Sequence, residues 1–205
     1  MVTKAETVSP VSNDGADLIT FSEPYIAHVT IEGTAALLFH RWSNEAVAEK
    51  AAATKGSKAK KSDNVESYVY RLDDGNLALP GEYLRQSIIG AARFRQDPRS
   101  PRKSAMDLFK AAVVPLTELA DLGVKDWDYL DRRRVLIQRN AITRERPALK
   151  AGWRATVDLL VNLPEYVDPT MLLETLGAAG RLIGIGDFRP TYGRYAVIGF
   201  EVTKG

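Results

Sequence analysis

The sequence has no cysteine and only two histidines, His28 and His40. A chain without cysteine forms neither disulfides nor thiolate metal sites, and two imidazoles argue against a zinc enzyme. No set of Asp, Glu and His residues has a metal-ligand spacing, and the sequence contains no serine or cysteine nucleophile motif. We therefore expect no metal and no other cofactor, and a reducing cytoplasm as the location.

Long apolar runs are also absent. No run reaches the roughly 18 residues of a membrane-spanning helix, and residues 1–15 lack the apolar block of a signal peptide, so we expect no membrane association. Apolar residues nevertheless make up 45% of the 205 residues. That content can fill a hydrophobic core, and the length fits one domain with insertions.

Charge is low overall but unevenly distributed. The net charge is only +2, yet basic residues gather in three segments, 50–61, 93–103 and 132–146, while many acidic residues lie elsewhere, as in 121–131. Such segregation predicts a basic surface on a nearly neutral protein, the pattern of a nucleic-acid-binding protein. The alternative interpretation is that each run is only a solvated face.

Secondary-structure patterns define the fold class. Six segments have the period-two alternation of a strand or the spacing and capping of a helix: a strand at 25–33, a helix at 80–96, strands at 132–146 and 153–161, a helix at 169–180 capped by Asp168 and Gly180, and a strand at 194–202. With right-handed crossovers, this order places both helices on one face of a sheet and leaves the other face open. The sequence therefore predicts an α+β fold, a ferredoxin-like (RRM-like) β-α-β-β-α-β core with a four-stranded antiparallel sheet.

The other segments are predicted to be a tail and two insertions. Residues 1–17 are rich in Ser, Thr, Asp and Gly, which predicts a flexible tail before a single domain at 18–205. The first insertion, 40–78, contains the lysine-rich segment and most of a hairpin that turns near Gly75. The second insertion, 97–131, has no pattern that assigns its elements.

The stretch 180–195, GRLIGIGDFRPTYGRY, carries the strongest functional signal. Glycines permit backbone angles closed to other residues, and arginine forks for phosphates with aromatic rings for bases are the ingredients of single-strand binding. A P-loop or dinucleotide motif is excluded because the stretch follows a helix and opens a strand. A glycine-rich connection with only a geometric role is the alternative. The candidate residues are Gly184, Gly186, Phe188, Arg189, Tyr192, Gly193 and Arg194.

Three patches resemble the RAMP superfamily of RNA-binding proteins. LPGEYLRQSIIGAAR (79–93) resembles the start of that superfamily's first helix, and GRLIGIGDFRPTYGRYAV (180–197) is similar to its C-terminal glycine-rich loop and final strand. The opening strand followed by LLFHR resembles the N-terminal strand of backbone subunits of CRISPR effector complexes. Asp187 departs from the denser glycine and basic run of RAMP loops, which favours a distant relative, phage-borne in one interpretation.

The resemblance implies a protein that binds single-stranded RNA or DNA, as a homo-oligomer along the strand or as a subunit of a larger complex. It implies a strand-contacting loop formed by Gly184, Gly186, Arg189, Gly193 and Arg194. On the first helix, Arg85 and Arg93 are the corresponding candidates. The insertion 40–78 would cover the nucleic acid as a thumb through Lys55, Lys58, Lys60 and Lys61, which rests on charge and placement.

Three functions stay open from the sequence. The leading interpretation is a non-catalytic nucleic-acid-binding subunit. The second is a metal-independent ribonuclease in which His40 acts as a general acid or base, and the third is a viral structural or scaffold protein whose basic patches contact acidic neighbours. His28 lies on the strand face opposite the apolar residues, where it is either a stacking partner for a base or an ordinary surface histidine.

Overall fold

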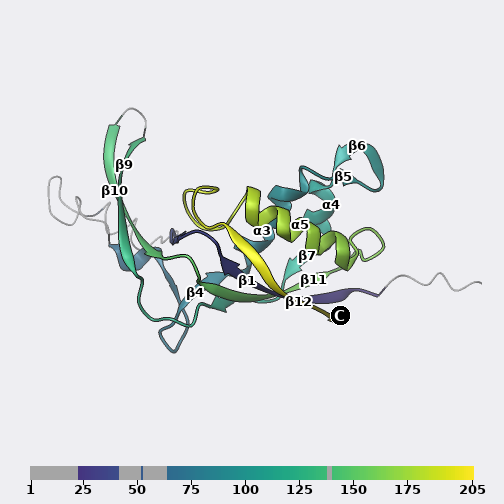
Figure 1. Cartoon of the computed structure of the whole chain (residues 1–205), viewed down its shortest axis with the longest axis horizontal. Coiled ribbons are helices and arrows are strands. Elements are labelled where there is room, and N and C mark those ends of the chain that lie inside the picture. Colours follow the sequence, from purple (N-terminus) through teal and green to yellow (C-terminus); the bar gives the residue numbers. More distant parts are fainter. Residues whose placement is uncertain (1–22, 42–51, 53–63, 138–139) are drawn as a thin grey trace, which may run out of the picture.

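The computed structural model describes residues 23–41, 52, 64–137 and 140–205, with backbone alone at 135–137 and 140–142. Its core is an antiparallel four-stranded sheet in the order β12–β1–β11–β7, with helices α3 and α5 on one face (Figure 1). The bounds are β1 Tyr25–Gly33, β7 Val113–Pro115, β11 Arg154–Val161, β12 Tyr195–Lys204, α3 Gly81–Ala92 and α5 Pro169–Leu182. This arrangement confirms the predicted ferredoxin-like α+β fold.

The core forms because the central strands alternate as their sequences predict. Along β1 the odd positions from Tyr25 to Ile31 are buried, and along β11 the residues from Ala155 to Val161 follow the same period. Both strands thereby direct one apolar face toward the helices, which add Leu84 from α3 and Leu172 from α5. Burying each Leu or Ile side chain stabilises the fold by about 1.5–3 kcal/mol.

Helix α5 begins where the sequence predicts and ends later. The Asp168 carboxylate accepts a hydrogen bond from the backbone N–H of Met171 at 2.8 Å, and proline occupies the first helical position. The predicted C-cap at Gly180 is wrong, because the helix continues to Leu182 and the left-handed conformation falls on Gly184, at φ 72°. Helix α3 ends at Ala92, before the predicted Gln96.

The second core strand is not the one that the sequence predicts. Residues 132–146 do not form one strand of the core sheet. They belong to a separate hairpin of β9 (Tyr129–Ile137) and β10 (Asn140–Leu149), and β10 continues three residues past the end of the predicted strand. The fourth position in the core sheet is taken by β7, which has only three residues and therefore too few for alternation to be recognised.

The β9–β10 hairpin extends away from the core at one end of the molecule (Figure 1). Its base is attached through β2 (Leu37–Leu38), which pairs with the end of β10. At the other end of the helical layer lies a second hairpin, formed by β5 (Gln96–Asp97) and β6 (Ser100–Ser104) and followed by α4 (Met106–Ala112). The β9–β10 and β5–β6 hairpins thus lie at opposite ends of the molecule.

The predicted hairpin near Gly75 is present. Strands β3 (Tyr70–Arg71) and β4 (Leu77–Pro80) are antiparallel, and Gly75 takes a φ of 88° in the turn between them. A short 3-10 helix, η1 (Val65–Tyr68), precedes β3, and β8 (Leu119–Asp121) pairs with the other edge of β4. Within the described residues, no helix has the length and apolar character to cross a membrane.

Candidate nucleic-acid interface

The glycine-rich segment between α5 and β12, residues 183–194, lies against the chain around β2; we call it the glycine loop. The backbone N–H of Asp187 donates to the Leu38 carbonyl at 3.0 Å, and that of Gly193 donates to the Ala36 carbonyl at 2.7 Å. Gly186 has a φ of 78°, and a Cβ there would meet the Leu38 carbonyl oxygen at 2.6 Å. Glycine is therefore needed for the loop to approach the base of the β9–β10 hairpin.

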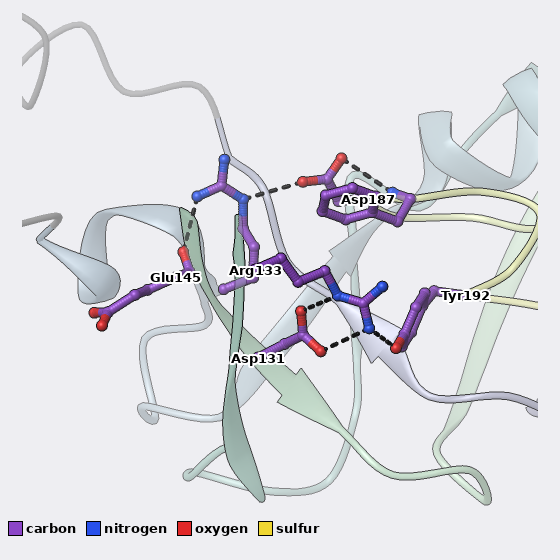
Figure 2. Close-up of polar contacts among 7 residues, drawn as sticks. Asp131, Arg133, Glu145, Asp187 and Tyr192 are labelled. Carbon is purple, nitrogen blue, oxygen red and sulfur yellow. Dashed lines mark hydrogen bonds and ion pairs between the residues drawn. The ribbon is translucent and has the colours of Figure 1, made fainter. Parts of the chain in front are cut away.

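Arg133 of β9 joins the hairpin to the glycine loop. Its Nε and Nη2 atoms donate to the two carboxylate oxygens of Asp131 at 2.5 and 2.9 Å, and Nη2 also donates to the Tyr192 hydroxyl. Figure 2 shows the Arg133 guanidinium held between Asp131 and Tyr192. The guanidinium carbon lies 4.5 Å from the Tyr192 ring centroid and 5.3 Å from that of Phe188. The rings of the loop thus hold an arginine of this chain.

A second connection is buried. Arg146 of β10 is 2% exposed, and its Nε donates to Asp187 at 3.0 Å while its guanidinium lies 4.1 Å from the Tyr68 ring centroid. The other carboxylate oxygen of Asp187 accepts from the backbone N–H of Phe188 at 3.0 Å, where the backbone takes a φ of 54°. Because a buried arginine needs a paired anion, the unexpected Asp187 of the sequence has a clear role: it compensates Arg146 and shapes the loop.

His40 lies at the same junction. Its Nδ1 is 3.9 Å from the Asp187 carboxylate, and its ring centroid is 5.7 Å from that of Tyr68. Next to it, Arg41 lies 5.3 Å above the Tyr70 ring, which makes an edge contact with Tyr83. Burial, with the Tyr70 hydroxyl beside it, raises the pKa of Tyr83, so Tyr83 is neutral at ordinary pH. The junction therefore combines basic side chains with aromatic rings on both sides of the loop.

Four further arginines of these two segments have side chains without a hydrogen bond or ion pair to any described residue. They are Arg134 and Arg144 of the hairpin and Arg189 and Arg194 of the glycine loop, of which all but the half-buried Arg144 are exposed. Arg132, in contrast, pairs with Glu145 at 2.7 Å. Charged guanidinium groups with open donors are the residues best suited to bind phosphates in two-point geometry.

The arginines predicted on α3 lie in different surroundings. Arg85 donates to the backbone carbonyls of Val113 and Lys110, each at 2.7 Å, and to Glu82 at 2.9 Å, so its guanidinium ties α3 to α4 and β7. Arg93 is exposed just after α3. A nucleic-acid contact by either arginine stays a prediction. The predicted lysines Lys55, Lys58, Lys60 and Lys61 lie outside the described residues.

The open face of the core sheet is less suited to nucleic acid. His28 bonds to Asp158 at 2.7 Å and to the Thr203 hydroxyl at 3.2 Å, so its ring nitrogens are both engaged. Arg154 pairs with Glu32 at 2.6 Å, and Glu201 is a further carboxylate in register with His28. Aromatic side chains of β1, β11 and β12 lie on the buried face instead, at Tyr25, Tyr195 and Phe200. This face therefore offers no stacking platform.

Arg133 and Arg146 are site residues that the sequence did not single out. The two arginines belong to a basic run that was recognised, and the register of the hairpin places Arg133 opposite Arg144 and Asp131 opposite Arg146 on one face. Reading the run as a single core strand concealed that face. For a metal, the described part of the chain contains no suitable group of three or more His, Asp or Glu side chains.

Comparison with known proteins identifies solved structures of similar fold but no family to which the sequence belongs. No family model matches the sequence, and no curated protein matches it. A chain of the type III-B Cmr-beta complex, solved by cryo-electron microscopy with cognate target RNA, matches with a TM-score of 0.51 and 10% identity over 89% of this chain and 61% of that one. This protein thus spans about three fifths of the length of that chain. At such low identity the likeness concerns the fold alone.

A second solved structure gives a weaker match. A chain of the Csm3–Csm4 subcomplex, from the type III-A CRISPR-Cas interference complex, matches with a TM-score of 0.40 and 14% identity over 90% of this chain and 80% of that one. Neither structure bears on a phage origin. The comparison with the type III-B chain therefore supports the predicted fold, and the resemblance to RAMP proteins stays a prediction.

Proposed function

We propose that this protein is a non-catalytic RNA-binding subunit of a larger complex and that single-stranded RNA crosses the junction of the glycine loop and the β9–β10 hairpin. One observation carries the proposal: two arginine-rich segments far apart in the chain meet through the Arg133–Tyr192 and Arg146–Asp187 contacts. Each segment also carries two arginines whose side chains have no partner among the described residues: Arg134 and Arg144 in the hairpin, and Arg189 and Arg194 in the glycine loop.

The chemistry of this surface favours the phosphate backbone over the bases. Arginines with open donors bind phosphates in any sequence context, whereas the rings of Phe188 and Tyr192 already hold Arg133. We therefore expect binding with little sequence preference. RNA is proposed rather than DNA because the type III-B chain of similar fold comes from a complex bound to target RNA. That comparison also supports membership of a larger complex.

Binding of fluorescently labelled single-stranded RNA and DNA at several salt concentrations tests the proposal. For single strands, each phosphate contact adds about 0.7 to the slope of log affinity against log salt. Replacing Arg189 and Arg194 together with alanine should reduce the slope by about 1.4. The matched control replaces Arg102 and Lys103, exposed cations of β6 at the other end of the molecule. Absence of RNA binding by the wild-type protein at low salt contradicts the proposal.

A ribonuclease stays the second candidate because His40 lies 3.9 Å from a carboxylate at the proposed RNA surface. A histidine there is able to act as a general acid or base. Incubation of labelled RNA with wild-type protein and His40→Ala separates the two functions. We expect intact RNA with both proteins. Cleavage that His40→Ala abolishes would replace the binding subunit with the enzyme, and assembly that depends on concentration alone would favour the scaffold.

A further inference from the structure

The Asp131–Arg133 pair lies within the proposed RNA surface. The two guanidinium nitrogens of Arg133 that could bind a phosphate together are bonded to Asp131 instead. The Asp131 carboxylate accepts from Nε and Nη2 of Arg133, at 2.5 and 2.9 Å. This side-on, two-bond geometry is the one in which a guanidinium also binds a phosphate. The Arg133 side chain is 35% exposed, so a strand that lies on the neighbouring arginines reaches it.

We propose that Asp131 is an internal competitor for RNA phosphate. In the free protein its carboxylate occupies Nε and Nη2 of Arg133, and a phosphodiester of the bound strand takes its place, while the guanidinium remains against Tyr192. No covalent bond changes in this exchange. The proposal rests on the proposed function, because it assumes that RNA crosses this junction, and it adds an affinity-limiting residue that the sequence did not indicate.

The hairpin register explains why Asp131 can release Arg133. Asp131 lies directly opposite Arg146 in the β9–β10 ladder, so a second cation is adjacent when the first is withdrawn. Arg146 cannot serve as the exchanging arginine itself. It is 2% exposed and its Nε is bound to Asp187. Of these two arginines, the accessible Arg133 is bonded to Asp131, and the buried Arg146 is bonded to Asp187.

The other end of the molecule supplies a matched control. In the β5–β6 hairpin, Arg99 donates through Nε and Nη2 to Asp97 at 3.0 and 2.8 Å, and it lies 5.6 Å from the Tyr166 ring centroid. Spacing, donor atoms and aromatic neighbour all correspond to those of the Asp131–Arg133 pair. Asp97→Asn therefore removes the same charge from the same kind of pair without touching the proposed RNA surface.

The test compares RNA affinity and salt dependence for the wild type, Asp131→Asn and Asp97→Asn. Asparagine keeps the size of the side chain and removes its charge. Asp131→Asn should bind single-stranded RNA about fivefold more tightly, which corresponds to about 1 kcal/mol, and its salt slope should steepen by about 0.7. Asp97→Asn should behave as the wild type. Equal gains in both variants, or no gain in Asp131→Asn, would overturn the proposal.

Arg133→Ala distinguishes competition from a general effect on structure. In that background Asp131→Asn should give no gain, because the arginine that it frees is gone; a gain that persists contradicts the exchange. If Asp131→Asn does not fold, Asp131→Ser is measured in its place, since it also removes the carboxylate. Failure of the wild type and both Asp131 variants to bind RNA rejects the proposed function, whereas wild-type binding that Asp131→Asn leaves unchanged rejects only the competitor.

Discussion

The two hairpins at the ends of the molecule contain nearly the same local chemistry in different surroundings. Each has an aspartate two residues before an arginine, a pair of bonds between their side chains, and a tyrosine against the guanidinium: Asp97, Arg99 and Tyr166 in one hairpin, Asp131, Arg133 and Tyr192 in the other. The surroundings of the two pairs differ. The β9–β10 pair meets the glycine loop through Tyr192, whereas the β5–β6 end carries Arg95, paired with Glu174 at 2.5 Å, and the exposed Arg102 and Lys103.

The further contacts of the two pairs also differ. Asp97 is 4% exposed, and it accepts from the backbone N–H of Arg99 at 2.9 Å as well as from its side chain, so it organises the turn of its own hairpin. Arg133 instead reaches across to Tyr192, a residue of another segment. The same ion-pair geometry therefore stabilises a turn within one hairpin and joins two separate segments in the other. The neighbouring residues determine which role the pair has.

The largest effect is expected from breaking the buried connection under the β9–β10 hairpin. Arg146→Ala leaves Asp187 without its buried partner, and removing one member of a buried pair costs about 3–5 kcal/mol. Urea unfolding followed by circular dichroism measures the change in the free energy of unfolding. The control is Arg144→Ala on the same strand, whose side chain has no partner among the described residues and should cost little. Equal losses in both variants would contradict the assigned role of Arg146.

A smaller effect should separate the two tyrosines. Tyr192→Leu removes the ring and hydroxyl that hold Arg133, and an exposed cation–π contact contributes about 0.5–1 kcal/mol. RNA affinity should therefore fall by roughly two- to fivefold. Tyr166→Leu removes the corresponding ring beside Arg99 and should leave RNA affinity unchanged. Fluorescence anisotropy with the same labelled RNA measures both variants. A loss of RNA affinity in Tyr166→Leu would place the strand on the β5–β6 hairpin and contradict the prediction.

The smallest change is a pH effect confined to the β5–β6 end. The Arg99 guanidinium lowers the pKa of Asp97 from its ordinary 3.8 to about 2. A lowered carboxyl pKa contributes stability above the unfolded-state value, and this contribution disappears as pH falls from about 4 toward 2. The wild type should be more stable than Asp97→Asn at pH 5, and the difference should shrink over that interval. A difference that is constant from pH 5 to pH 2, in acid unfolding followed by circular dichroism, would contradict the assignment.

The parts of the fold that were predicted correctly have strong local signals. Alternation in 25–33 and 153–161 gave the central strands, and Asp168 before a proline gave the start of α5. The part that was wrong has no such signal: β7 has only three residues, and its place depends on pairing with β11. The hairpin of β9 and β10 was read as one strand because its basic pattern continues through 132–146 and contains no glycine or proline before 147.

The sequence indicated one of the two segments that form the candidate site. The glycine loop is recognisable because glycine, arginine and aromatic residues together are uncommon in a simple turn. Its partner was hidden, since only tertiary structure brings Arg133 to Tyr192 and Arg146 to Asp187. The structure also changes the role assigned to the aromatic residues. Phe188 and Tyr192 contact Arg133 of the hairpin, a contact that the local sequence does not reveal.

The path of the strand is the central claim, and photocrosslinking tests it most directly. Single-stranded RNA that carries 4-thiouridine is bound to the wild-type protein, irradiated and digested, and the crosslinked peptides are identified by mass spectrometry. The account predicts crosslinks in residues 129–149 and 183–194. Crosslinks confined to the β5–β6 hairpin or to the open face of β1 and β11 would contradict it.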